Sequence, residues 1–92
     1  MDTNDLHKFL HFLNHVFNDS VMWRIIKTLS RSEGLTLREL ARRSEVAPKT
    51  LYKYIDALQR KGVVEIYRPG PRVMIIKLSE RYAWLRQYLN HT

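Results

Sequence analysis

The sequence predicts a mostly α-helical domain, of the α+β class, that carries one small β-hairpin near its C-terminal end. Apolar residues recur every three or four positions through most of the chain up to Lys61, which is the period of helices buried on one face. After Gly62 two short runs rich in β-branched residues, 63–67 and 73–78, flank the sequence RPGPR. Such runs around a Pro/Gly turn predict a hairpin. With 92 residues, 45% of them hydrophobic, the chain is expected to form one domain over 1–92.

Two helices are expected at the N-terminal end of the domain, together covering 5–31. The first, at 5–17, and the second, at 20–31, each carry one apolar stripe at helical spacing. The stripes consist of Leu6, Phe9, Leu10, Leu13, Val16 and Phe17 in the first helix, and of Val21, Met22, Ile25, Ile26 and Leu29 in the second. Gly34 is expected to stop the second helix in a left-handed conformation.

A pair of helices joined by a tight turn is expected at 36–61. Thr36 and Glu39 form a capping box, in which the side chain of each residue accepts a free backbone N–H of the other. This box predicts a short helix at 37–43. A second helix follows at 48–61, and the spacing of the two helices is that of a helix-turn-helix.

Proline and glycine mark the two ends of the second helix of this pair. Pro48 suits the first turn, because the N–H that proline lacks would have no partner there. Ala47 precedes it, where a capping hydroxyl is usual, and an alanine cap costs about 1 kcal/mol. Gly62 is the expected stop. A last helix is expected at 80–90, with Ser79 as its cap.

The net positive charge of the chain comes entirely from its second part. The net charge is +7, with four bases and four acids in residues 1–33 and twelve bases and five acids in residues 34–92. The whole excess therefore lies in the part that holds the predicted helix pair and hairpin. Such a distribution favours a polyanionic partner.

From residue 35 to residue 79 the chain reads LTLRELARRSEVAPKTLYKYIDALQRKGVVEIYRPGPRVMIIKLS, about half of its length. A leucine-rich first helix, a valine in the turn, a second helix and a glycine before a hairpin follow one another here. In this order the sequence strongly resembles winged helix-turn-helix transcription regulators of the MarR and ArsR kind. The resemblance implies a winged helix-turn-helix fold that binds double-stranded DNA. Ala47 departs from the family's pattern, which usually has serine or threonine at this position.

Four side chains of the helix at 48–61 are candidate contacts to DNA. A helix fits the major groove with its early turns against base edges. The apolar stripe turns inward, so Lys49, Tyr52 and Lys53 point outward. Thr50 lies at the head of the same helix. The lysines suit phosphate or guanine, and the tyrosine suits stacking, a thymine methyl group or phosphate. The alternative is an ordinary solvated helix face.

Arginines on the two neighbouring elements extend this basic surface. Arg38, Arg42 and Arg43 lie on the first helix of the pair, which crosses the DNA backbone in this geometry. They are candidate phosphate contacts, and ordinary solubility is the alternative. Arg68 and Arg72 flank the hairpin tip, where arginine suits a narrow minor groove or the adjacent backbone. A plain polar turn is the alternative there.

Neither a metal nor a cofactor is expected. Three histidines, His7, His11 and His15, share one face of the first predicted helix, and two histidines four apart can chelate a metal. However, the chain has no cysteine, and no acidic residue completes a recognisable ligand pattern around them. An exposed polar face is the preferred interpretation.

Aromatic residues gather on the first and last predicted helices, which favours a homodimer. Core packing accounts for some of them, but together they exceed what one small core would cover. Related regulators also pair through their terminal helices. The candidate interface consists of Phe9, Leu13, Trp84, Leu85 and Tyr88. A twofold dimer would place the two DNA-contacting helices about one DNA turn, ~34 Å, apart.

The expected function is that of a dimeric, sequence-preferring DNA-binding regulator of transcription. An architectural, nucleoid-type DNA-binding protein of the same fold and a winged helix used for protein–protein contact remain alternatives. We expect no enzyme, because no catalytic arrangement of residues is present. The acidic, polar start MDTNDLHKF is no signal peptide, and no apolar run is long enough to span a membrane. We therefore expect a cytoplasmic, nucleoid-associated protein, and nothing in the sequence marks an effector site.

Overall fold

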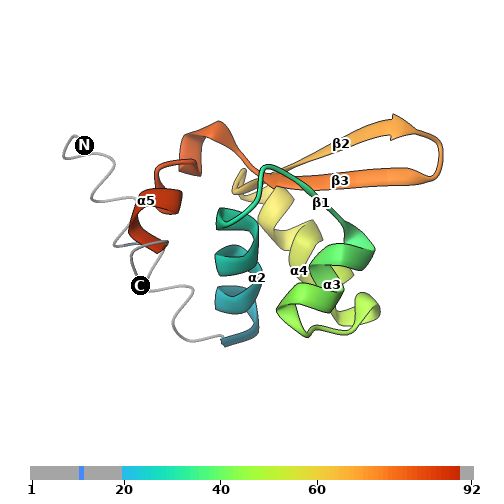
Figure 1. The fold of residues 1–92 in the computed structure, drawn as a ribbon, viewed down its shortest axis with the longest axis horizontal. Helices are drawn as coiled ribbons and strands as arrows, with labels where there is room; N and C mark the ends of the chain where they lie inside the picture. Colours follow the sequence, from blue (N-terminus) through green and yellow to red (C-terminus); the bar gives the residue numbers. More distant parts are fainter. Residues whose placement is uncertain (1–10, 12–19, 90–92) are drawn as a thin grey trace.

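The computed structural model describes residue 11 and residues 20–89, and it has the predicted class, mostly helical with a small antiparallel sheet (Figure 1). Its elements in chain order are α2 (Ser20–Ser30), β1 (Leu35–Thr36), α3 (Leu37–Ser44), α4 (Pro48–Arg60), β2 (Val64–Gly70), β3 (Val73–Leu78), the 3₁₀ helix η1 (Glu80–Tyr82) and α5 (Leu85–Leu89). The predicted order of five helices and two strands differs from the four α-helices, one 3₁₀ helix and three strands in this part of the chain. The predicted helix at 5–17 lies outside the described residues, apart from His11, which is helical and exposed.

The three helices α2, α3 and α4 lie together at the centre of the molecule (Figure 1). The β2–β3 hairpin extends past α3 and α4 on one side, and α5 packs against α2 on the other. The hairpin therefore stands beside the helix pair α3–α4 as a wing. Its far end is free of the rest of the fold in the view of Figure 1.

The core is formed by the inner faces of all these elements. Ile25, Ile26 and Leu29 of α2 are completely buried, at the spacing that the sequence predicts. The other buried apolar residues are Leu35, Leu40, Ala41, Val46, Leu51, Ile55, Leu58, Val63, Val64, Ile76, Leu78 and Leu85. Each fully buried leucine or isoleucine stabilises the fold by about 1.5–3 kcal/mol relative to an exposed one. This core holds α3, α4 and the base of the wing in fixed relative positions.

The sheet has the strand order β1-β3-β2, and both pairs are antiparallel. β1 has only two residues, too few for any period to show in the sequence. β2 continues to Gly70, beyond the predicted run at 63–67. Its register is irregular between Tyr67 and Gly70, which is where Pro69 lies. A proline is tolerated at such an irregularity because it has no N–H to give to the ladder.

The predicted role of Gly34 as a left-handed helix stop is wrong. α2 ends at Ser30, and Gly34 has a φ of 157°, well away from the left-handed helical region. A Cβ atom at this position would lie 2.9 Å from Cγ2 of Ile75, closer than side chains pack. Glycine is therefore required by the close approach of the chain to β3, just before β1 begins.

The predicted single helix at 80–90 is also wrong. The chain forms η1, then a turn, and then α5, so the helical segment is divided. Ser79 makes no side-chain cap to η1. Its hydroxyl instead donates to the carbonyl oxygen of Gly62, at 2.7 Å. The residue that the sequence marks as a helix cap is used to join two distant segments.

Candidate nucleic-acid interface

The start of α3 is held by the predicted capping box. The backbone N–H of Glu39 donates to Oγ1 of Thr36 at 3.1 Å, and the backbone N–H of Thr36 donates to Oε1 of Glu39 at 3.2 Å. The backbone N–H of Thr36 and then its hydroxyl hold the pKa of the Glu39 carboxyl below its ordinary value of 4.5. This cap positions the first turn of α3, from which Arg38 projects into solvent.

A left-handed residue makes the turn between α3 and α4. Glu45 has φ 58° and ψ 41°, and its backbone N–H donates to the last carbonyls of α3, those of Ala41 and Arg42. The backbone N–H of Val46 also donates to the Ala41 carbonyl, at 3.1 Å. Val46 is buried, so the turn is anchored in the core. These contacts set the angle at which α4 leaves α3.

α4 begins as the sequence predicts, with proline in its first turn and no side-chain cap. Ala47 has φ −60° and ψ 142° and makes no side-chain hydrogen bond to the helix. Its carbonyl oxygen accepts the backbone N–H of Leu51 at 2.8 Å. Pro48 at the helix start removes one N–H that would otherwise lack a partner. The helix therefore starts without a capping hydroxyl, and proline leaves one free donor fewer in its first turn.

The outer face of α4 presents all four predicted DNA contacts to solvent. Lys49, Thr50 and Lys53 are exposed, and Tyr52 is 54% exposed. The opposite face, with Leu51, Ile55 and Leu58, is buried in the core. The burial of one face thus fixes which side chains point outward. Among the ion pairs of the described residues, none involves Lys49 or Lys53, so both ammonium groups remain available to a partner.

The wing carries its two predicted arginines close to its tip. Arg68 lies on β2 beside the irregular register, and Arg72 lies in the turn after Gly70. Both are exposed. Nearer the base of the wing, Lys77 pairs with Glu65 at 3.7 Å across the two strands. The tip of the wing is therefore basic, whereas the charges of Lys77 and Glu65 nearer its base cancel each other.

An open hollow of about 520 Å³ lies between the first turn of α3, the second turn of α4 and the wing. Its lining residues are Thr36, Leu37, Arg38, Tyr52, Arg68, Pro71, Arg72, Val73 and Met74. The structure therefore brings together one predicted contact from α3, one from α4 and both from the wing. The hollow is a concave surface bordered by three elements that carry basic side chains. This shape and charge suit contact with the phosphate backbone of a DNA duplex.

Five of the predicted DNA-contacting residues lie outside this hollow. Lys49, Thr50 and Lys53 are on the same exposed helix as Tyr52, which does line it. Arg42 and Arg43 are exposed in the last turn of α3. The sequence did not single out the apolar members of the lining, such as Leu37 and Met74. The only signal in the sequence for these lining residues is position: Leu37 follows Thr36 of the capping box, and Met74 lies close to the hairpin turn.

The residues predicted for the dimer contact fall into three groups. Phe9 and Leu13 lie outside the described residues, as does the side chain of Tyr88. Trp84 is partly buried against the core, and its indole N–H donates to the carbonyl oxygen of Arg81 at 3.0 Å. Leu85 is completely buried within the single chain. It has no surface left for a partner, so we assign it to the core.

Of the three histidines that are predicted to share one helix face, the structure describes His11. His7 and His15 lie outside the described part of the chain, and His11 is exposed. Within the residues that the structure describes, no group of three or more histidine or acidic side chains is placed to hold a metal ion.

A helix pair with a basic outer helix, joined to a two-stranded wing, defines the winged-helix class of nucleic-acid-binding domains. The chain belongs to the winged helix-turn-helix DNA-binding family, whose pattern matches residues 19–65, just over half of the sequence. The match includes α2, the helix pair and the start of the wing.

Several solved structures have the same fold. NadR in complex with 4-hydroxyphenylacetate superimposes with a TM-score of 0.72 at 22% identity, over 96% of this chain and 64% of its own. Reduced HlyU from Vibrio cholerae gives 0.72 at 18% identity, over 97% and 88%. The MarR family transcriptional regulator SPO1453 from Silicibacter pomeroyi gives 0.66 at 19% identity, over 89% and 61%. This chain thus spans less than two thirds of the length of NadR and of SPO1453.

No curated protein matches the chain closely in sequence. None of the helices in the described part of the chain is long and apolar enough to cross a membrane.

Proposed function

We propose that this chain regulates transcription by binding double-stranded DNA with a sequence preference. In this proposal α4 enters the major groove, with Lys49, Thr50, Tyr52 and Lys53 against bases and phosphates. The wing tip, with Arg68 and Arg72, lies on the minor groove or the neighbouring backbone. The three arginines of α3, Arg38, Arg42 and Arg43, hold phosphates and so position the domain.

The observation that carries this proposal is the shared hollow between α3, α4 and the wing. Arg38, Tyr52 and Arg72 come from three separate elements, and all three line it. Three exposed arginines, Arg38, Arg68 and Arg72, border this one concave surface, as is expected of contact with a polyanion. The charge distribution agrees, since the entire net charge of +7 lies in residues 34–92. The regulators that share the fold, such as the MarR family protein from Silicibacter pomeroyi, support a role in transcription.

The proposal includes a twofold homodimer formed by the terminal helices. It rests on the many aromatic side chains in these segments, of which Trp84 is only partly buried in the single chain. A dimer would present two α4 helices to successive major grooves, about 34 Å apart. We expect such a protein to act in the compartment that holds the DNA, on the nucleoid.

Selection of bound duplexes from random DNA at physiological salt tests the function, together with a mass measurement in solution. A sequence-preferring dimer would enrich a palindrome with half-sites about one helical turn apart and would have twice the mass of one chain. Tight binding without enrichment would replace the regulator by an architectural DNA-binding protein. Absence of binding even at low salt would reject DNA as the partner and leave a protein–protein module.

A further inference from the structure

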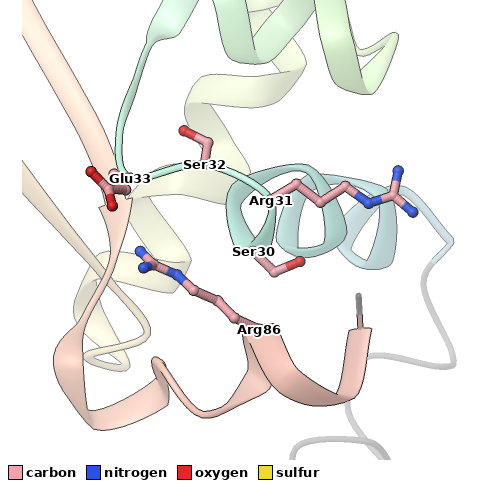
Figure 2. Close-up of a pocket in the computed structure, with 5 residues that line it drawn as sticks. All are labelled: Ser30, Arg31, Ser32, Glu33 and Arg86. Atoms are coloured by element: carbon pink, nitrogen blue, oxygen red, sulfur yellow. The ribbon is translucent and has the colours of Figure 1, made fainter. Parts of the chain in front are cut away.

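A second hollow, of about 210 Å³, lies where the end of α2 faces α5. It is lined by Ser30, Arg31, Ser32, Glu33 and Arg86 (Figure 2). None of these residues lines the hollow of the nucleic-acid interface, so the two are separate. All five lining residues carry a polar or charged group, and the carbon atoms of these residues form the rest of the wall.

Arg86 supplies the positive side of this hollow. It follows Leu85, which is completely buried and so fixes the backbone from which Arg86 extends. Figure 2 shows its side chain reaching from α5 toward Glu33. Its Nε atom is buried and has no hydrogen-bond partner. Because this atom has almost no accessible surface, a ligand in the hollow would meet the terminal nitrogens of the guanidinium group, which Figure 2 shows at the end of the side chain.

Glu33 and the end of α2 supply the negative side. Glu33 is exposed, and neither of the two ion pairs recorded among the described residues involves it or Arg86. α2 ends at Ser30, and the carbonyl end of a helix carries partial negative charge that attracts cations. Arg31, the other base of the lining, points away from Arg86 in Figure 2. The hollow therefore has one cationic and one anionic side.

The two hydroxyl groups of the lining are already engaged within the chain. Ser30 donates to the carbonyl oxygen of Lys27 at 2.7 Å. Ser32 accepts the backbone N–H of Gly34 at 2.9 Å, which leaves its own hydrogen to donate. The free hydrogen-bonding capacity of the hollow thus lies mainly with Arg86 and Glu33.

We propose that this hollow binds a small amino acid, with its carboxylate on Arg86 and its ammonium group on Glu33 and the carbonyl end of α2. A carboxylate accepts from the terminal N–H groups of the guanidinium in charge-assisted hydrogen bonds. A simple anion would leave Glu33 facing it unpaired, and a simple amine would leave Arg86 unpaired. A cavity of roughly 150 Å³ holds benzene, so this hollow has room for a molecule of about six to eight non-hydrogen atoms.

The test follows the Nε–H resonance of Arg86 by ¹H–¹⁵N correlation NMR while L-alanine, L-serine or L-valine is added to the full chain. At least one of them is expected to shift this resonance in a saturable manner. Propionate and ethylamine serve as analogues that each lack one of the two charged groups. The proposal would be overturned if either analogue bound as tightly as the amino acids. It would also be overturned if no resonance shifted up to about 20 mM amino acid, because a dissociation constant of about 20 mM corresponds to a binding free energy of only roughly −2 kcal/mol.

Two variants separate the two ends of the ligand. Arg86→Lys keeps the charge but removes the planar pair of terminal N–H donors that suits a carboxylate, and it is expected to weaken amino-acid binding roughly tenfold or more in a calorimetric titration. Glu33→Gln is expected to weaken amino-acid binding similarly while it leaves propionate binding unchanged or stronger. Because Glu33 is exposed, this second variant keeps the test valid if Arg86→Lys fails to fold.

Arg24→Ala is the matched control, since Arg24 is an exposed base on α2 that does not line the hollow. Its binding of amino acids is expected to equal that of the unsubstituted chain. A loss in Arg24→Ala as large as that in Arg86→Lys would show that the effect does not depend on the residues of the hollow, and it would reject the site. The measurement involves no DNA, so its outcome is independent of the function proposed above.

Discussion

Ser79, at the end of β3, donates its hydroxyl hydrogen to the carbonyl oxygen of Gly62, at the end of α4, across 2.7 Å. The backbone N–H of Ser79 donates to the carbonyl oxygen of Val63 at 2.9 Å. Ser79 is buried and Gly62 is half-buried, so the bond between them is partly shielded from water. The two bonds of Ser79 hold the base of the wing against the end of α4, and thereby fix the position of the wing relative to the helix proposed to enter the major groove.

Replacement of Ser79 by alanine is expected to lower the free energy of unfolding by about 1–2 kcal/mol. The Gly62 carbonyl oxygen would lose its side-chain partner in a position that water reaches poorly. Urea denaturation followed by circular dichroism measures the change. Thr28→Ala is the control, because its exposed hydroxyl only donates to the Arg24 carbonyl within α2. That control is expected to stay within about 0.5 kcal/mol, and equal losses in the two variants would deny Ser79 its joining role.

Joint replacement of Lys49 and Lys53 by alanine is expected to weaken DNA binding and its dependence on salt. Each lysine that contacts a phosphate releases about one counterion, so the slope of log affinity against log salt should fall by roughly 2. Fluorescence anisotropy titrations over a range of salt concentrations provide both quantities.

The control for this experiment removes two bases from α2 instead. Arg24 and Lys27 lie on α2, outside the hollow between α3, α4 and the wing. Their joint replacement by alanine lowers the net charge by the same amount and should change the slope much less. An unchanged affinity after Lys49→Ala/Lys53→Ala would contradict the placement of α4 in the groove.

Replacement of Glu45 by glycine is expected to stabilise the domain by about 1 kcal/mol. Glu45 has a φ of 58°, a conformation that is strained for a side-chain-bearing residue and free of strain for glycine. Its backbone N–H bonds to the end of α3 would be kept. Thermal unfolding measured by calorimetry should show the gain. Glu45→Gln removes the same charge but keeps the strain, so a matching gain in that variant would assign the effect to charge instead.

Replacement of Glu39 by glutamine is expected to flatten the acid dependence of stability. Hydrogen bonds from Thr36 lower the pKa of Glu39 in the folded state below its usual value of 4.5. A carboxyl with a lowered folded pKa contributes stability that is complete above its unfolded pKa and is lost as pH falls through the folded pKa. The melting temperature of the unsubstituted chain should therefore fall more steeply below pH 4.5 than that of Glu39→Gln.

Glutamine still supports a capping box, so the two proteins should differ little at neutral pH. Parallel curves of melting temperature against pH from neutrality to the acid range would show that the bonds with Thr36 do not stabilise the ionised carboxyl.

Patterns within one turn of helix were enough to predict most of the helices. The capping box of Thr36 and Glu39, the proline start of α4 and the buried face with Leu51 all depend on residues three or four apart. The outward direction of Lys49, Tyr52 and Lys53 follows from the same spacing. The predicted boundaries of the helix pair therefore agree with those of α3 and α4 to within a residue.

Contacts between residues far apart in the chain produce no such short-range pattern in the sequence. The bond between Ser79 and Gly62 joins residues 17 positions apart, and it withdraws Ser79 from the cap that the local sequence indicates. The close approach of Gly34 to Ile75 and the two-residue strand β1 likewise depend on the position of β3. For this reason the predictions of a single C-terminal helix and of a left-handed stop at Gly34 were wrong.

The sequence by itself determined the class of the fold, the helix pair and the side chains of α4 that face solvent, because these follow from short-range periodicity and burial. Only the tertiary structure decided that Arg38, Tyr52, Arg68 and Arg72 share one hollow, and that Arg86 faces Glu33 across another. Such arrangements depend on how α2, the wing and α5 pack on a common core. That packing is a sum over many long-range contacts, and no single stretch of the chain encodes it.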